Sequence, residues 1–133
     1  MGFAQRKENF WGKVRRTMQD YKVEYAFDDR LQVSGKILER YPDRVPVICE
    51  PRDRGKLKLD KTKFLCPRDY KMGHFVLTLR RRLQQEVNSS DAIYIFSNGQ
   101  IVPNSMTMGE IYEKHKDSDG LLYFVFDKES TFG

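Results

Sequence analysis

The side chains best suited to covalent or metal chemistry are few and widely spaced in this sequence. Cys49 and Cys66 are the only cysteines, and His74 and His115 are the only histidines. Neither pair has the short spacing that a zinc site or a thioredoxin-like dithiol requires. No Ser-His-Asp or Cys-His signature and no Gly-rich phosphate-binding loop accompanies them. We therefore expect no metal or cofactor, and two reduced cysteines packed as small apolar side chains.

The composition predicts a single basic domain. A chain of 133 residues has no room for two domains of ordinary size. Its net charge of +5 fits attraction to anionic membranes, acidic peptides or nucleic acid, or simply a solvated surface. No run approaches the ~18 apolar residues of a membrane-spanning helix, and residues 1–20 are too charged for a secretory signal. We expect the protein to be made and kept in the cytosol.

Two helices are predicted ahead of the first strand. Residues 6–25 alternate charged with apolar side chains near i, i+4 and i+8, which gives a helix one apolar face. Asp28 or Asp29 is placed to cap a second helix. That helix continues to Tyr41 and is stopped by Pro42.

The stretch 41–50 combines a turn with a short, apolar, β-branched strand. Pro46 lies inside the strand pattern and has no N–H for a ladder on one side. We therefore expect an edge strand with one side unpaired, which is a place where an extended partner can bind.

From this strand onward the predicted order is strand, strand, helix, strand, strand, short helix, strand. The last strand is almost continuously apolar, which is typical of the buried centre of a sheet. This order indicates an α+β, ubiquitin-like β-grasp with a mixed sheet and two additional N-terminal helices. The predicted elements after 41–50 are 63–66, a helix capped by Asp69 that reaches Leu83, 93–96 and 100–102 around an Asn98-Gly99 turn, a helix from Met108 to near His115, and 121–126.

Three parts follow from this order. Residues 1–40 form an N-terminal helical region, whose first 18 residues are an unusual extension. Residues 41–127 form the β-grasp domain. Residues 128–133 leave the last strand as a polar, flexible tail.

A series of short motifs runs in order from about Tyr21 to Gly133. They are Tyr41-Pro42-Asp43-Arg44-Val45-Pro46-Val47-Ile48, Leu59-Asp60-Lys61, Lys63-Phe64-Leu65, Pro67, Gly73 with Phe75, Arg80 to Arg82, Met108-Gly109, Ile111-Tyr112 and Phe132-Gly133. This set resembles the ubiquitin-like autophagy modifiers, the family that includes the GABA-receptor-associated protein and the microtubule-associated light chain proteins. So many matches in order make the resemblance specific.

The resemblance implies a modifier that is not itself an enzyme. Its terminal glycine, Gly133, would be activated with ATP, passed between cysteines of an activating and a conjugating enzyme, and joined to phosphatidylethanolamine. A cysteine protease would release it from the lipid, and cargo receptors would bind it in autophagosome formation. It would be cytoplasmic, and on the autophagosomal membrane when lipidated. Glycine suits this role because it lacks a Cβ and can thread narrow active sites.

The resemblance also implies a peptide site for aromatic-x-x-aliphatic motifs, formed by strand addition and two side-chain pockets. The pocket for the aromatic anchor would be lined by Ile37, Pro46, Ile48, Lys63, Leu65 and Leu121. The pocket for the aliphatic anchor would be lined by Phe64, Cys66, Pro67, Tyr70, Phe75 and Thr78. Acidic residues beside the anchors would meet Arg44, Lys61, Lys63 and Arg82. Ordinary core packing is the alternative for the apolar members.

Some positions depart from the family pattern. Leu121 stands where relatives usually carry an aromatic residue, and Thr78 and Cys66 replace aliphatic ones, so the pockets are expected to differ in selectivity. Within the extension, Trp11 and Val14 have the aromatic-x-x-aliphatic spacing of a ligand for the chain's own groove, although the same residues fit an amphipathic helix.

Two other functions remain open from the residues. One is a soluble peptide-binding adaptor or trafficking protein that is never lipidated. The other is a nucleic-acid or cytoskeleton binder, suggested by Arg15-Arg16 and Arg80 to Arg82. We do not expect nucleic acid to be the partner, because these arginines stand at helix ends rather than among exposed aromatics along a groove.

Overall fold

Nine elements make up the part of the chain that the computed structural model describes, which is residues 20–53, 57–83 and 86–129. The predicted strand and helix order from the first strand onward is confirmed. Of the first predicted helix, 6–25, only its last residues fall in the described part. The elements are α2 (Asp20–Glu24), α3 (Phe27–Arg40), β1 (Arg44–Pro51), β2 (Lys63–Pro67), α4 (Met72–Arg82), β3 (Ala92–Ser97), β4 (Gln100–Ile101), α5 (Met108–His115) and β5 (Leu122–Glu129).

The five strands form one mixed sheet in the order β2-β1-β5-β3-β4. β1 runs parallel to β5, and the other neighbours are antiparallel. β5 lies in the middle, as its apolar sequence predicts, and Phe124 and Phe126 are fully buried. It also continues past the predicted start of the tail at 128, because Lys128 and Glu129 still pair with β3. The ubiquitin-like β-grasp with a mixed sheet is therefore confirmed.

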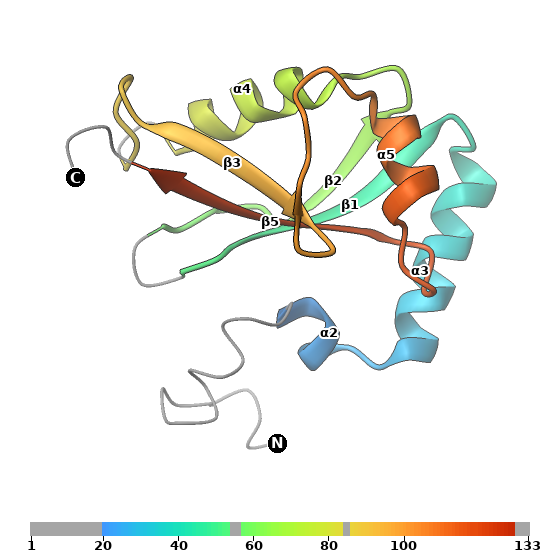
Figure 1. Ribbon diagram of the computed structural model, residues 1–133. Helices are drawn as coiled ribbons and strands as arrows, with labels where there is room; N and C mark the ends of the chain where they lie inside the picture. Colours follow the sequence, from blue (N-terminus) through green and yellow to red (C-terminus); the bar gives the residue numbers. More distant parts are fainter. Residues whose placement is uncertain (1–19, 54–56, 84–85, 130–133) are drawn as a thin grey trace.

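Helices cover both faces of the sheet. The Phe75 ring of α4 lies 5.5 Å from the Phe124 ring of β5, whereas the Tyr21 ring of α2 lies 6.4 Å from the ring of Tyr123. Neighbouring residues of a strand point to opposite faces, so α4 and α2 lie on opposite sides of β5. Figure 1 shows this arrangement, with α4 above the sheet and α2 below it.

β1 is an interior strand, so the prediction that 41–50 is an edge strand is wrong. It pairs with β2 on one side and with β5 on the other. The Cys49 N–H bonds on the β2 side, and since N–H groups alternate along a strand, Pro46 faces β5. The β1–β5 register begins only at Val47 opposite Leu122. The proline therefore lies just before that ladder starts and interrupts no bond in it.

Turn and cap residues fix the ends of several elements. Asn98 and Gly99 both have positive φ, as a two-residue hairpin turn requires, and join β3 to β4. Thr107 begins α5 with a capping box shared with Glu110.

The predicted caps of the other helices are wrong. Ala26 precedes α3, and Asp28 and Asp29 lie inside its first turn, where carboxylates interact favourably with the helix dipole. Lys71 rather than Asp69 precedes α4, without a side-chain cap. No helix among the described residues is long and apolar enough to cross a membrane.

Candidate functional site

β2 lies at one edge of the sheet, and β4 lies at the other. In the part of the chain that the structure describes, β2 pairs with β1 alone. The Thr62 carbonyl accepts a hydrogen bond from the Cys49 N–H of β1 (2.8 Å), so every second residue after Thr62 also faces β1. The backbone groups of Lys63 and Leu65 therefore point toward the open side. Such an edge is a template for an extended peptide.

The side chains of β2 divide between the two faces of the sheet. Phe64 points to the α4 side, where its ring contacts Phe75 edge to face at 5.2 Å. Lys63 points to the opposite side, where its Nζ lies 5.8 Å from the centroid of the Tyr21 ring of α2. The residues assigned to the aliphatic and aromatic pockets thus lie on the α4 face and on the α2–α3 face respectively.

The residues assigned to the aromatic pocket lie beside one another, but only half of them are accessible. Across the β1–β2 register Pro46 faces Leu65 and Ile48 faces Lys63, which puts each pair on one face. Leu121 joins Ile48 in a buried cluster, and Ile37 stands on α3, which packs on β1. Ile37 and Leu65 are half-buried, Lys63 is exposed, and Pro46, Ile48 and Leu121 are buried.

Two tyrosines that the sequence reasoning did not assign complete this region. Tyr21 is buried against Ile48 and Leu121, and its ring lies 4.7 Å from that of Tyr25. The Lys63 ammonium lies within 6 Å of both ring centroids, which is the range of a cation–π contact. The spacing of Tyr21 and Tyr25, four residues apart, was the available signal.

The aliphatic set is more closely tied to the interior. Cys66 and Phe75 belong to the main hydrophobic core, and Phe64 and Tyr70 pack against it while partly exposed. These two core residues can form only the floor of a pocket. Pro67 and Thr78 are half-buried at its rim, and the Thr78 hydroxyl donates to the His74 carbonyl at 3.2 Å.

Cations flank the open edge at both of its ends. Lys61 and Lys63 are exposed near the start of β2, and Arg44 lies opposite Pro67 at its end. Arg82 of α4 reaches the same side, where it pairs with Asp60 at 3.0 Å. An acidic residue beside a bound peptide's anchors would therefore meet positive charge, although each exposed pair contributes only about 0.2–1 kcal/mol.

A buried polar network holds α3 to the turn that precedes β5. Arg30 Nη1 lies 2.6 Å from Asp119 Oδ2, and the Tyr123 hydroxyl donates to the same oxygen at 2.5 Å. The Ser34 hydroxyl donates to the Asp119 carbonyl. Gly120 has a φ of +88°, and a Cβ there would lie 2.4 Å from Ser34 Oγ. Burial, and then the hydrogen bond to Asp119, raise the pKa of Tyr123.

Burial disfavours nucleophilic chemistry at both cysteines. Both are free and buried, as predicted. Burial raises the pKa of the Cys66 thiol to about 12, although the positive charges of Lys61 and Arg44 act to lower it. Burial also raises the pKa of the Cys49 thiol well above its usual value. The reactive thiolate is therefore not populated near neutral pH. No cluster of metal-ligating side chains occurs in residues 20–53, 57–83 and 86–129.

Two of the predicted features lie outside the described residues. One is Gly133, the expected point of conjugation. The other is the extension 1–18 with its Trp11 and Val14 motif. The open edge of β2 and its flanking residues are thus the candidate site within the described part.

Residues 29–133 match the family described as autophagy protein Atg8, ubiquitin-like. Autophagy-related protein 8 of Schizosaccharomyces pombe is 40% identical over 114 residues, which cover 85% of this chain and 93% of that protein. The crystal structure of Trypanosoma brucei ATG8 superposes with a TM-score of 0.76 and 40% identity, covering 86% of this chain and 98% of that one. Plasmodium falciparum Atg8, solved in complex with a P. falciparum Atg3 peptide, has a TM-score of 0.74 and 33% identity, with 85% and 98% covered.

Proposed function

Because the chain belongs to the Atg8 family of ubiquitin-like autophagy proteins, we propose that it is joined through Gly133 to phosphatidylethanolamine and recruits partners by binding peptides along β2. The observation that carries the second half is the open β2 edge, with outward backbone groups at Lys63 and Leu65. The family match reaches residue 133, which supports the first half.

In this proposal the backbone of β2 supplies affinity and its flanking side chains supply selectivity. An aromatic-x-x-aliphatic segment adds a strand beside β2, its aromatic anchor on the α2–α3 face and its aliphatic anchor on the α4 face. Acidic residues next to the anchors meet Arg44, Lys61, Lys63 and Arg82. The complex of the P. falciparum relative with an Atg3 peptide supports peptide binding by this fold. Cargo receptors and conjugating enzymes are the proposed partners.

Conjugation gives the protein its place on the membrane. Two acyl chains hold a protein stably at a bilayer, since each buried methylene contributes about 0.8 kcal/mol. The proposed modifier is therefore cytoplasmic when free and on the autophagosomal membrane when lipidated. A cysteine protease that cleaves after Gly133 would return it to the cytoplasm.

The experiment for conjugation is reconstitution with the activating and conjugating enzymes, ATP and liposomes that contain phosphatidylethanolamine. We expect a product of shifted electrophoretic mobility from the intact chain and none after removal of Gly133. An undiminished product without Gly133 would refute this attachment point.

The experiment for peptide binding replaces a pocket residue by a charged one. Leu65→Asp places a carboxylate among half-buried apolar side chains, so we expect the affinity for an aromatic-x-x-aliphatic peptide to fall by roughly tenfold or more. Leu77→Asp is the matched control, because Leu77 is 50% exposed on α4. Equal binding by both variants would mean that β2 is not the site. Lipidation of both variants should continue.

A soluble adaptor that is never conjugated is the second candidate. It is favoured by the fact that the open β2 edge needs no lipid in order to bind a peptide. The reconstitution experiment distinguishes the two candidates. Peptide binding without any shifted product from the intact chain would support the adaptor.

A further inference from the structure

An aromatic ring of the protein itself already covers the floor of the aromatic pocket. Tyr21 of α2 is only 6% exposed and clusters with Ile48, Leu121 and Tyr123. Ile48 and Leu121, two of the six residues proposed to receive a partner's aromatic anchor, retain 3% and 1% exposure. With Tyr21 packed in this cluster, these two side chains are not accessible to a second aromatic ring.

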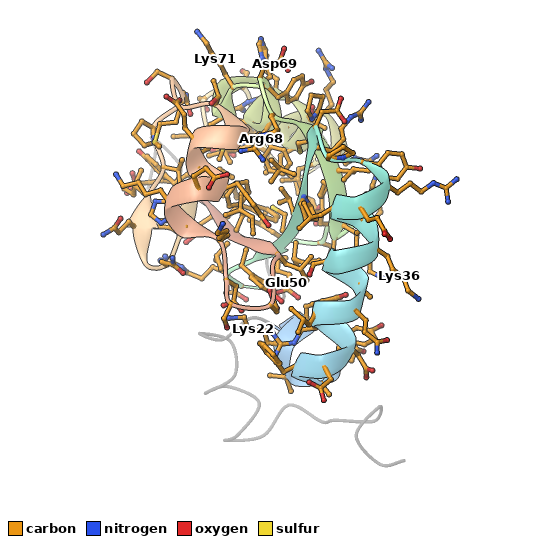
Figure 2. All side chains as sticks on the ribbon, turned by 90° about the vertical axis from the view of Figure 1, so that its right-hand side faces the viewer. Lys22, Lys36, Glu50, Arg68, Asp69 and Lys71 are labelled. Carbon is orange, nitrogen blue, oxygen red and sulfur yellow. The ribbon has the colours of Figure 1, made fainter. Side chains whose placement is uncertain are left out.

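The helix that carries this ring is short, and hydrogen bonds and an ion pair to side chains of the β-grasp domain hold it in place. α2 has five residues, and an isolated helix of that length is not stable in water. The Glu50 carboxylate accepts hydrogen bonds from the backbone N–H groups of Asp20 (3.1 Å) and Tyr21 (3.0 Å). Lys22 Nζ lies 2.5 Å from Asp117 Oδ1. Lys22 and Glu50 both lie at the α2 end of the molecule, away from Arg68 (Figure 2).

A cavity lies next to the start of α2. A cavity of about 310 Å³ is lined by Asp20 and Glu50 together with Leu57 and Leu59. Since one water takes up ~30 Å³ in the liquid, the cavity is far larger than a single water. The start of α2 is therefore not tightly packed on this side.

We propose that α2 is a lid on the aromatic pocket, with Tyr21 as its resident aromatic side chain, which leaves when a partner's aromatic anchor enters. This inference rests on the proposed peptide-binding function of β2. Only the open state, in which Tyr21 has left the pocket, can receive the anchor. When this state is only partly populated, the apparent affinity for the peptide is reduced in proportion to its population. The contacts of α2 therefore set how strongly a partner must bind in order to open the pocket.

Lys63 links the lid to the ligand. Its ammonium lies 5.8 Å from the Tyr21 ring centroid and 5.9 Å from that of Tyr25. The same exposed side chain is a proposed contact for acidic residues of the peptide. A peptide that combines an aromatic anchor with a neighbouring acidic residue replaces both partners of Lys63, so it favours opening more than an uncharged peptide does.

Binding of a fluorescently labelled aromatic-x-x-aliphatic peptide tests the lid. Lys22→Gln breaks an ion pair that is partly exposed, so we expect affinity to rise about two- to fivefold. Tyr21→Ala removes the ring itself, and we expect a rise of about tenfold or more. Lys116→Gln is the matched control, because it also removes an exposed lysine pair, with Glu113 of α5, but no contact with α2. It should leave affinity unchanged.

Hydrogen exchange of single amides gives a readout that does not depend on these variants folding well. Peptide binding should speed exchange of the Tyr21 amide, because it loses Glu50 as acceptor, and leave that of Met72, which bonds to Met106, unchanged. If the wild type binds the peptide but neither variant binds more tightly and the Tyr21 amide does not exchange faster, the lid is wrong and the peptide site stands. If neither the wild type nor any variant binds the peptide, both the proposed peptide site and the lid are wrong.

Discussion

Asp119→Asn is the substitution most damaging to the way the N-terminal helices are attached. The Asp119 side chain is fully buried, and its Oδ2 receives both Arg30 Nη1 (2.6 Å) and the Tyr123 hydroxyl (2.5 Å). Its Oδ1 accepts the Leu121 N–H at 2.8 Å. The amide keeps the shape of the carboxylate but leaves the Arg30 guanidinium, whose side chain is 11% exposed, without an anionic partner.

Removing one partner of a buried ion pair destabilises a protein by about 3–5 kcal/mol, so we expect the free energy of unfolding to fall by about 3 kcal/mol or more. Urea denaturation followed by circular dichroism measures it. Asp127→Asn is the control: its pair with Arg52, at 3.8 Å, is partly exposed, and we expect a loss of less than about 1 kcal/mol in the free energy of unfolding. Adding Arg30→Met to Asp119→Asn should restore part of the loss. A loss for Asp119→Asn no larger than that for Asp127→Asn would refute the reasoning.

Two further predictions concern α5. Thr107→Ala removes the cap that accepts from the Glu110 N–H, so the unfolding free energy should fall by about 1 kcal/mol; no change relative to Ser118→Ala, an exposed control, would contradict it. Burial, and then Lys114, lower the pKa of His115. The unfolded chain therefore binds a proton at His115 more readily than the folded protein does. The stability that neutral His115 contributes is complete above pH ~6.5 and is lost as the pH falls toward the lower pKa of the folded state. Between pH 7.5 and 5, the free energy of unfolding of His115→Gln should therefore depend less steeply on pH than that of the wild type. The same pH dependence in both proteins would argue against this role of His115.

Local patterns predicted the elements of the β-grasp well. The Asn98-Gly99 turn has one favourable hairpin geometry, and the run 121–126 is too apolar for an edge. The position of β1 could not be predicted from Pro46. A proline removes one N–H on one side only, and the sequence does not show where the ladder on that side begins.

The candidate site was predicted only in outline. The family resemblance assigned Lys63 and Leu65 to one pocket, but the sequence could not distinguish accessible lining from interior, as with Ile48 and Leu121. Tyr21 was missed because its neighbours come from β1 and from the start of β5, which are far along the chain. Long-range burial of this kind depends on packing rather than on local periodicity.

The most direct measurement for the central proposal is amide hydrogen exchange along β2 with and without an aromatic-x-x-aliphatic peptide. The Lys63 and Leu65 amides point to the open edge, whereas Phe64 and Cys66 face β1. We predict fast exchange at Lys63 and Leu65 in the free protein, strong slowing when the peptide is bound, and slow exchange at Phe64 and Cys66 in both states. A peptide that binds without slowing Lys63 and Leu65 would contradict strand addition at β2.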